Sequence, residues 1–321
     1  MFALRGIAVS FSIFVMLYSA LSLAVCGVWR KVFSYAQGLP ARRSADLLFT
    51  LRMVPFLLAT AATLALAVPS FLLLEPRVVN EPLGGVPVAL GLCGLAVLVA
   101  GMWKAASAWV RAWQTIARWS SGACLVASSS ADSSGSVPVL RLSATAPPLT
   151  AAGVFRPSVW LSRAAEFVLS ERELQAALRH EVVHVRRRDN LRKLILHLVA
   201  FPGMVELESA WREATEMAAD DAAVSNVAEA LDLAAAVIKL SRLAPLQAPA
   251  ELITALVHSP AESLNARVER LIAWTEQPQN AAPRYSLGYA LCAAAAVAAT
   301  LVLTYSELLV RVHTATEWLV R

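Results

Sequence analysis

The stretch SERELQAALRHEVVH, residues 170–184, decides the fold of the large polar segment of this chain. Ser170 and Glu173 have the spacing of a capping box, in which the serine side chain accepts an early backbone N–H and the glutamate bonds back to the helix start. A helix therefore begins here and continues through His180 and His184. Histidines four residues apart lie on one face of a helix, about one turn from each other, so both imidazoles can reach one metal ion.

The pattern His180-Glu181-x-x-His184 predicts a catalytic Zn²⁺ site. Such sites hold the ion with three protein ligands and leave one position open. Glu181 follows the first histidine, so its carboxylate lies beside the ion and can take a proton from water there. We predict His180 and His184 as metal ligands and Glu181 as the catalytic base. An exposed helix with two unrelated histidines is the alternative, but the chain has only five histidines, so an accidental match is rare.

The third ligand is predicted among the carboxylates downstream, because no cysteine lies at a suitable place. The candidates are Glu206, Glu208, Glu213 and Glu216. We choose Glu216, since Asp220 follows it four residues later on a predicted helix and can accept the remaining N–H of a ligand histidine. Solvated surface charges are the alternative for Glu216 and Asp220, and the preferred interpretation for the other three glutamates.

The composition indicates a membrane protein. Hydrophobic residues make up 58% of the chain and charged residues only 16%, whereas a typical soluble domain has ~25% charged residues. A bilayer requires about 20 apolar helical residues. Four uncharged runs are long enough to be transmembrane helices: 6–29, 53–74, 83–103 and 285–306.

The charges between these runs predict the orientation. The loop after the first run carries five basic residues against Asp46 alone, whereas the loop after the second carries Arg77 against Glu75 and Glu81. By the positive-inside rule, the first loop faces the cytoplasm. We therefore expect a multi-pass protein of the inner (cytoplasmic) membrane with both termini outside. Its parts are a membrane domain (1–103), a cytoplasmic domain (104–284), the fourth transmembrane helix (285–306) and a short extracytoplasmic tail (307–321).

The cytoplasmic segment mixes helical patterns with extended pieces. Val137–Leu142 alternates like a strand, 128–136 has the composition of a loop, and 153–161 looks like a second extended piece. The residues 264–272 predict a helix that packs on the domain before the last span. We expect Asp189, after the second histidine, to anchor its turn through an ion pair.

Three stretches together resemble the BlaR/MecR family of integral membrane zinc metallopeptidases. They are HEVVHVRRRDN at 180–190, GVFRPSVWL at 153–161, and Glu216 with Asp220. The resemblance implies a mainly helical α+β, gluzincin-like peptidase domain inserted between the third and fourth transmembrane helices. It also implies antirepressor or sensor-transducer activity, with a cytoplasmic protein such as a winged-helix repressor as the substrate. Because only 307–321 follow the last predicted span, we expect no β-lactam-sensing domain.

Two other functions stay open. The chain also resembles the HtpX and CAAX-protease families, which share the zinc helix and the Glu-x-x-x-Asp element, so membrane-protein quality control is one alternative. A non-proteolytic membrane sensor or scaffold is the other, although it has no need for Glu181. Basic residues are not interleaved with aromatics, so direct nucleic-acid binding is not expected. His258 is a candidate for polarising the scissile carbonyl, with a helix-end residue as the alternative.

Overall fold

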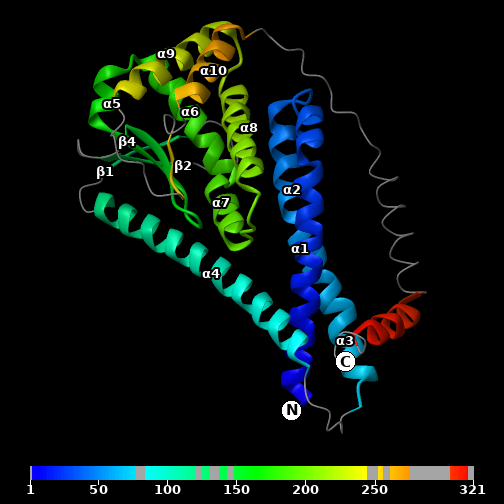
Figure 1. Ribbon diagram of the computed structural model, residues 1–321. Helices are drawn as coiled ribbons and strands as arrows, with labels where there is room; N and C mark the ends of the chain where they lie inside the picture. The colour runs from blue at the N-terminus through cyan, green and yellow to red at the C-terminus, as the bar shows by residue number, and fades with distance from the viewer. Residues whose placement is uncertain are drawn as a thin grey trace. The chain divides into compact units, whose positions relative to one another are not determined.

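The computed structural model describes residues 2–76, 84–120, 124–129, 137–142, 148–243, 252–255, 261–274 and 304–316. These residues form a mainly helical protein with one five-stranded sheet (Figure 1). The helices are α1 (Phe2–Ala36), α2 (Ala41–Ala62), the π-helical η1 (Thr63–Ala67), α3 (Val68–Leu74), α4 (Gly85–Ser120), α5 (Arg163–Val168), α6 (Glu171–Arg187), α7 (Asp189–Leu198), α8 (Val205–Ala223), α9 (Val227–Leu243), α10 (Ala261–Ile272) and a further helix at 304–316. The strands are β1 (Cys124–Ser129), β2 (Val137–Leu142), β3 (Leu149–Ala152), β4 (Ser158–Ser162) and β5 (Thr254–Ala255).

The chain divides into two compact units. The first unit comprises Met1–Val28, Met53–Val99 and Gln277–Arg321, and the second comprises Trp29–Arg52 and Ala100–Glu276. The predicted boundary between residues 103 and 104 therefore falls inside the continuous helix α4. The segment predicted as a loop between the first two spans is largely helical and belongs to the second unit, because α1 extends to Ala36 and α2 starts at Ala41.

Three helical stretches of the described residues are long and apolar enough to cross a membrane. They are Phe2–Ala36, Ala41–Leu74 and Gly85–Ser120. Each includes most of one predicted apolar run and extends beyond it, since the helices continue into polar sequence. The fourth predicted span, 285–306, lies outside the described residues except for its last three, which open the helix at 304–316. The orientation of the chain and its predicted membrane boundaries stay predictions.

In the first unit, the helix at 304–316 contacts the end of the second apolar stretch. The hydroxyl of Tyr305 donates to the carbonyl of Ala65 in η1 at 2.7 Å. Ser70 in α3 donates through its hydroxyl to the carbonyl of Leu309 at 3.0 Å. The residue four positions after Ala65 is Pro69, which has no N–H to donate to that carbonyl. The tyrosine therefore supplies a partner to the carbonyl at 65.

The sheet of the second unit has the strand order β1-β2-β4-β3-β5. The pair β2 and β4 is parallel and the other pairs are antiparallel. The strand predicted at Val137–Leu142 is confirmed as β2. The extended piece predicted at 153–161 is confirmed from Ser158 onward as β4, whereas 153–157 form a turn that begins at Gly153, directly after β3. That glycine has φ 98°, and a Cβ there would lie 2.7 Å from the carbonyl oxygen of Arg156, so the turn requires glycine.

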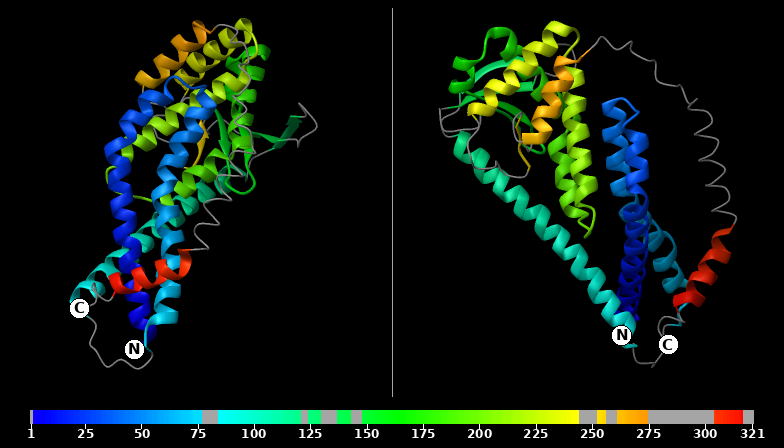
Figure 2. Two further views of the ribbon diagram at one scale, coloured as in Figure 1. Left: turned by 90° about the vertical axis from the view of Figure 1, so that its right-hand side faces the viewer. Right: turned by 45° about the horizontal axis from the view of Figure 1, so that its top comes forward.

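The sheet lies between two helical layers of the second unit. The main core joins apolar residues of β2, β3 and β4 to those of α5, α6, α9 and α10. On the other face, Trp119 near the end of α4 packs beside Trp160 of β4, at 5.9 Å between ring centroids. Figures 1 and 2 show α6 in the interior of this arrangement, between the sheet and the helices α8 and α9. The helix that carries the histidines thus lies inside the unit, with His180, Glu181 and His184 buried.

Candidate metal centre

The predicted capping box is present at the start of α6. The backbone N–H of Ser170 donates to Glu173 Oε2 at 2.8 Å, and the backbone N–H of Glu173 donates to the Ser170 hydroxyl at 3.4 Å. Lys239 of α9 also donates to Glu173, at 2.8 Å. The cap fixes the first turn of the helix and the lysine ties it to its neighbour. The register that places the histidines inward is therefore set locally.

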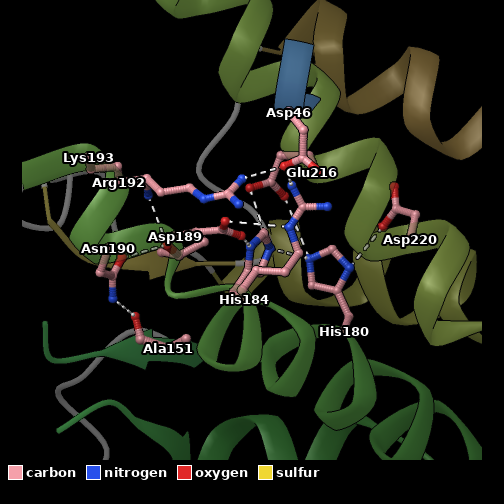
Figure 3. A network of polar contacts seen from close by, with 12 residues as sticks. Asp46, Ala151, His180, His184, Asp189, Asn190, Arg192, Lys193, Glu216 and Asp220 are labelled. Atoms are coloured by element: carbon pink, nitrogen blue, oxygen red, sulfur yellow. Dashed lines mark hydrogen bonds and ion pairs between the residues drawn. The ribbon is translucent and has the colours of Figure 1, made fainter. Parts of the chain in front are cut away.

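The structure brings His180, His184 and Glu216 together. The two Nε2 atoms of the histidines lie 3.1 Å apart. Glu216, from α8, places its Oε2 3.6 Å from His180 Nε2 and its Oε1 3.6 Å from His184 Nε2. Figure 3 shows both rings turned toward this carboxylate. Donors bound to one tetrahedral ion at ~2.0–2.1 Å are separated by about 3.3 Å, so the spacing fits a single Zn²⁺-sized ion.

A carboxylate lies behind each histidine. His180 Nδ1 is 3.0 Å from Asp220 Oδ1, and His184 Nδ1 is 2.7 Å from Asp189 Oδ2. A carboxylate at Nδ1 fixes the ring orientation and keeps the proton on that nitrogen, which leaves the Nε2 lone pair for a metal. Asp220 thus lies where the sequence places it, behind a ligand histidine. Asp189 does more than anchor a turn, because it orients His184.

The contact of Asp189 depends on an unusual turn. Helix α6 ends at Arg187, and the next residue, Arg188, has φ 54° and ψ 42°, the left-handed conformation that commonly terminates helices. The chain then enters α7 directly, with Asp189 as its first residue. Across this turn, the carboxylate of Asp189 contacts the histidine five residues earlier.

Arg267 is a buried member of the site that the sequence did not reveal. It lies on α10, is 1% exposed, and donates to both oxygens of Asp220 at 2.9 and 2.7 Å. Its third nitrogen, Nη1, lies 3.0 Å from Glu216 Oε2. The guanidinium therefore holds the third donor and the carboxylate behind His180 in one arrangement. The helix at 264–272 was predicted, but nothing in the sequence linked its arginine to a carboxylate 47 residues earlier.

The charges of the site favour a divalent cation. Burial opposes the charge of Glu216, but His184 and Arg267 lower its pKa to about 2. Burial also opposes the charge of Asp220, whose pKa Arg267 and His180 lower. Both groups are therefore ionised, and Arg267 supplies one positive charge between them. Asp189 has its own cation nearby, since Arg187 Nε lies 3.5 Å from its Oδ1. Two imidazole nitrogens and one ionised carboxylate match the ligands that Zn²⁺ takes in catalytic sites.

Glu181 is fully buried beside these donors. Neither of its oxygens has a regular hydrogen-bond partner among the described residues, although the backbone of Ala151 in β3 weakly favours its charged form. Burial raises the pKa of Glu181 to about 7. A buried carboxylate without partners is costly unless it has a function or an absent partner. Its charge interacts with those of His184, His180 and Glu216, so it lies near the three possible metal ligands.

The other candidate residues lie elsewhere. Glu206 pairs with Arg30 at 3.0 Å on the surface, and Glu208 pairs with Arg52 at 3.0 Å. Glu213 is exposed on α8. The described residues place none of the three with the histidines, in agreement with the choice of Glu216. His258 lies outside the described residues.

The sequence was compared with protein-family models and with curated proteins. No protein-family model and no curated protein matches this chain. The resemblance to the BlaR/MecR family therefore rests on the quoted residues alone. What the structure adds is a buried group, His180, His184 and Glu216, that could bind a metal ion.

Proposed function

We propose that this protein is a membrane-embedded, zinc-dependent endopeptidase that hydrolyses a cytoplasmic or membrane-proximal protein. One observation carries the proposal. Three donor atoms of His180, His184 and Glu216 lie within 4.8 Å of one another, beside the buried and partnerless carboxylate of Glu181. A structural site would need no such carboxylate, whereas hydrolysis of a peptide bond needs a group that accepts and returns a proton.

Different residues would have different roles in hydrolysis. A bound Zn²⁺ would act as a Lewis acid and lower the pKa of water toward ~7. His180, His184 and Glu216 would hold the ion, with their orientation fixed by Asp220, Asp189 and Arg267. Glu181 would accept the proton of the attacking water and pass it to the leaving amine. Its pKa of about 7 suits a group that must both take and give a proton near neutral pH.

A membrane location limits the class of proteins that the enzyme could cut. Three apolar helices indicate a membrane protein, and the loop charges of the sequence predict a peptidase domain on the cytoplasmic side. The resemblance to the BlaR/MecR family favours a transcriptional repressor of the winged-helix type as the protein that is cut. Hydrolysis of such a repressor would make the enzyme a step in a signalling pathway.

The test compares cells that carry the wild-type protein with cells that carry Glu181→Gln. The matched control is Glu213→Gln, an exposed glutamate on α8. New protein N-termini should appear with the wild type and the control and be absent with Glu181→Gln, while purified Glu181→Gln retains its zinc. One dedicated soluble substrate supports the signalling role. Cleavage of many membrane proteins would replace it with quality control, and identical N-termini in all three strains would contradict peptidase activity.

A further inference from the structure

The first turns of α2 face the helices of the metal centre within the second unit. Asp46, Phe49 and Arg52 are spaced three residues apart, so they lie along one side of α2. Each contacts a different part of the helical layer that holds the ligands. The segment was predicted as a charged loop, and its charges are instead used in specific contacts.

Asp46 begins a series of ion pairs that ends at a ligand. Its Oδ1 atom is 2.8 Å from Arg192 Nη1 in α7 and 3.8 Å from Arg187 Nη2 at the end of α6. Arg187 Nε in turn lies 3.5 Å from Asp189 Oδ1, and Asp189 contacts His184 through its other oxygen. Figure 3 shows Asp46 of α2 above this network. The orientation of His184 is thus linked to α2 through two side chains.

Arg52 ties the same helix to α8, which carries Glu216. It is 1% exposed, and its Nε donates to Glu208 Oε1 at 3.0 Å. Its Nη2 also donates to the carbonyl of Val199, just after α7. Glu208 precedes Glu216 by eight residues, about two turns on the same helix. Breaking a buried charge pair of this kind is costly, so this anchor is firm.

Phe49 lies between these two polar contacts. Its ring packs against Trp211 of α8 at 5.9 Å between centroids, and the Arg192 guanidinium lies 5.3 Å from its centroid. The aromatic contact and the cation–π contact both join α2 to the ligand-bearing helices. One side of α2 therefore holds α6, α7 and α8 in fixed relation.

We infer that α2 is a working part of the metal centre, in which Asp46 and Arg52 are positioning residues for His184 and Glu216. The inference rests on the proposed metal site and adds its regulation. Helix α2 runs without interruption from Ala41 to Ala62, and its later residues belong to an apolar stretch long enough to span a membrane. The first turns of α2 contact the helices that carry His184 and Glu216, so the affinity for metal depends on the contacts of Asp46 and Arg52.

The experiment measures metal binding by the purified full chain in detergent. Asp46→Asn, Arg52→Gln and the double variant are compared with Glu166→Gln. Glu166 of α5 pairs with Arg141 of β2 at 2.7 Å. This ion pair is partly exposed, as is the pair of Asp46 with Arg192. Zinc affinity is measured by competition with a chelating dye, and ligand geometry from the visible spectrum of the Co²⁺ form.

The double variant should bind zinc about tenfold more weakly, the lower end of what loss of outer partners costs a metal site, and its Co²⁺ spectrum should change. Glu166→Gln should match the wild type, and Asp46→Glu should recover the loss seen with Asp46→Asn. A double variant with wild-type affinity and spectrum would overturn the inference, as would an equal loss in Glu166→Gln. A wild-type chain that binds neither ion would instead sink the proposed function.

Discussion

Asp189 Oδ2 lies 2.7 Å from His184 Nδ1, across the left-handed turn at Arg188 that separates α6 from α7. This contact makes the junction of two helices part of the metal centre. The carboxylate fixes the orientation of the ring, whose other nitrogen faces Glu216. The site therefore depends on backbone geometry outside the helix that carries the histidines.

Replacing Asp189 tests this dependence. Asp189→Ala should lower zinc affinity by roughly 10- to 100-fold, because His184 loses its orienting partner. The measurement is competition with a chelating dye on the purified protein. Asp221→Ala is the control, since Asp221 pairs at 2.6 Å with Arg270, and both side chains are partly exposed. Equal affinities in the two variants would remove Asp189 from the metal centre.

Arg267 should matter most when no metal is bound. Arg267→Met leaves Glu216 and Asp220 buried without their cation, which should destabilise the metal-free protein by about 3–5 kcal/mol. Added zinc should restore part of the loss, because it supplies positive charge at the same place. Arg270→Met, on the same helix but partly exposed, should cost less than ~1 kcal/mol. Thermal unfolding with and without zinc distinguishes them, and similar midpoints for both variants would contradict this role.

The raised pKa of Glu181 predicts a pH-dependent stability. The protonated form is favoured in the folded protein, so its contribution is complete below pH 4.5 and is lost as the pH rises through about 7. The loss is of order 3 kcal/mol, at ~1.4 kcal/mol for each unit of pKa. Glu181→Gln cannot ionise and should escape it.

The comparison uses protein stripped of metal with a chelator. The unfolding midpoint of Glu181→Gln should rise relative to wild type between pH 5 and pH 7.5. The low pKa values of Glu216 and Asp220 put their own effects at lower pH, and His180 is present in both proteins. A difference between the two midpoints that stays constant across this range would show that Glu181 is not held protonated by burial.

Local patterns explain how much of this site the sequence could predict. The cap at Ser170 and the four-residue spacing of His180 and His184 are helical geometry, so they are readable from the chain. Glu216 and Asp220 are also one turn apart and were chosen on that ground. The structure places all of these residues together.

The contributions of Asp189, Arg267 and α2 could not be read in this way. The role of Asp189 depends on the left-handed turn at Arg188. Glycine usually occupies such a position, so an arginine there gives no sequence signal for the turn. Arg267 comes from a helix whose pairing with α8 is a long-range contact. Asp46 and Arg52 were interpreted as loop charges, because the positive-inside rule counts charged residues without regard to their ion-pair partners. In the structure these partners are Arg192 and Glu208.

The central claim is that two imidazoles and one carboxylate hold a single zinc ion, and X-ray absorption at the zinc edge of the purified full chain tests it most directly. We predict one zinc per chain, with nitrogen and oxygen neighbours at ~2.0–2.1 Å and the outer scattering of two imidazole rings. In Glu216→Gln, the zinc signal should be weaker and its shape altered. A chain that purifies without zinc and takes up none, or a spectrum dominated by sulfur at ~2.3 Å, would contradict the claim.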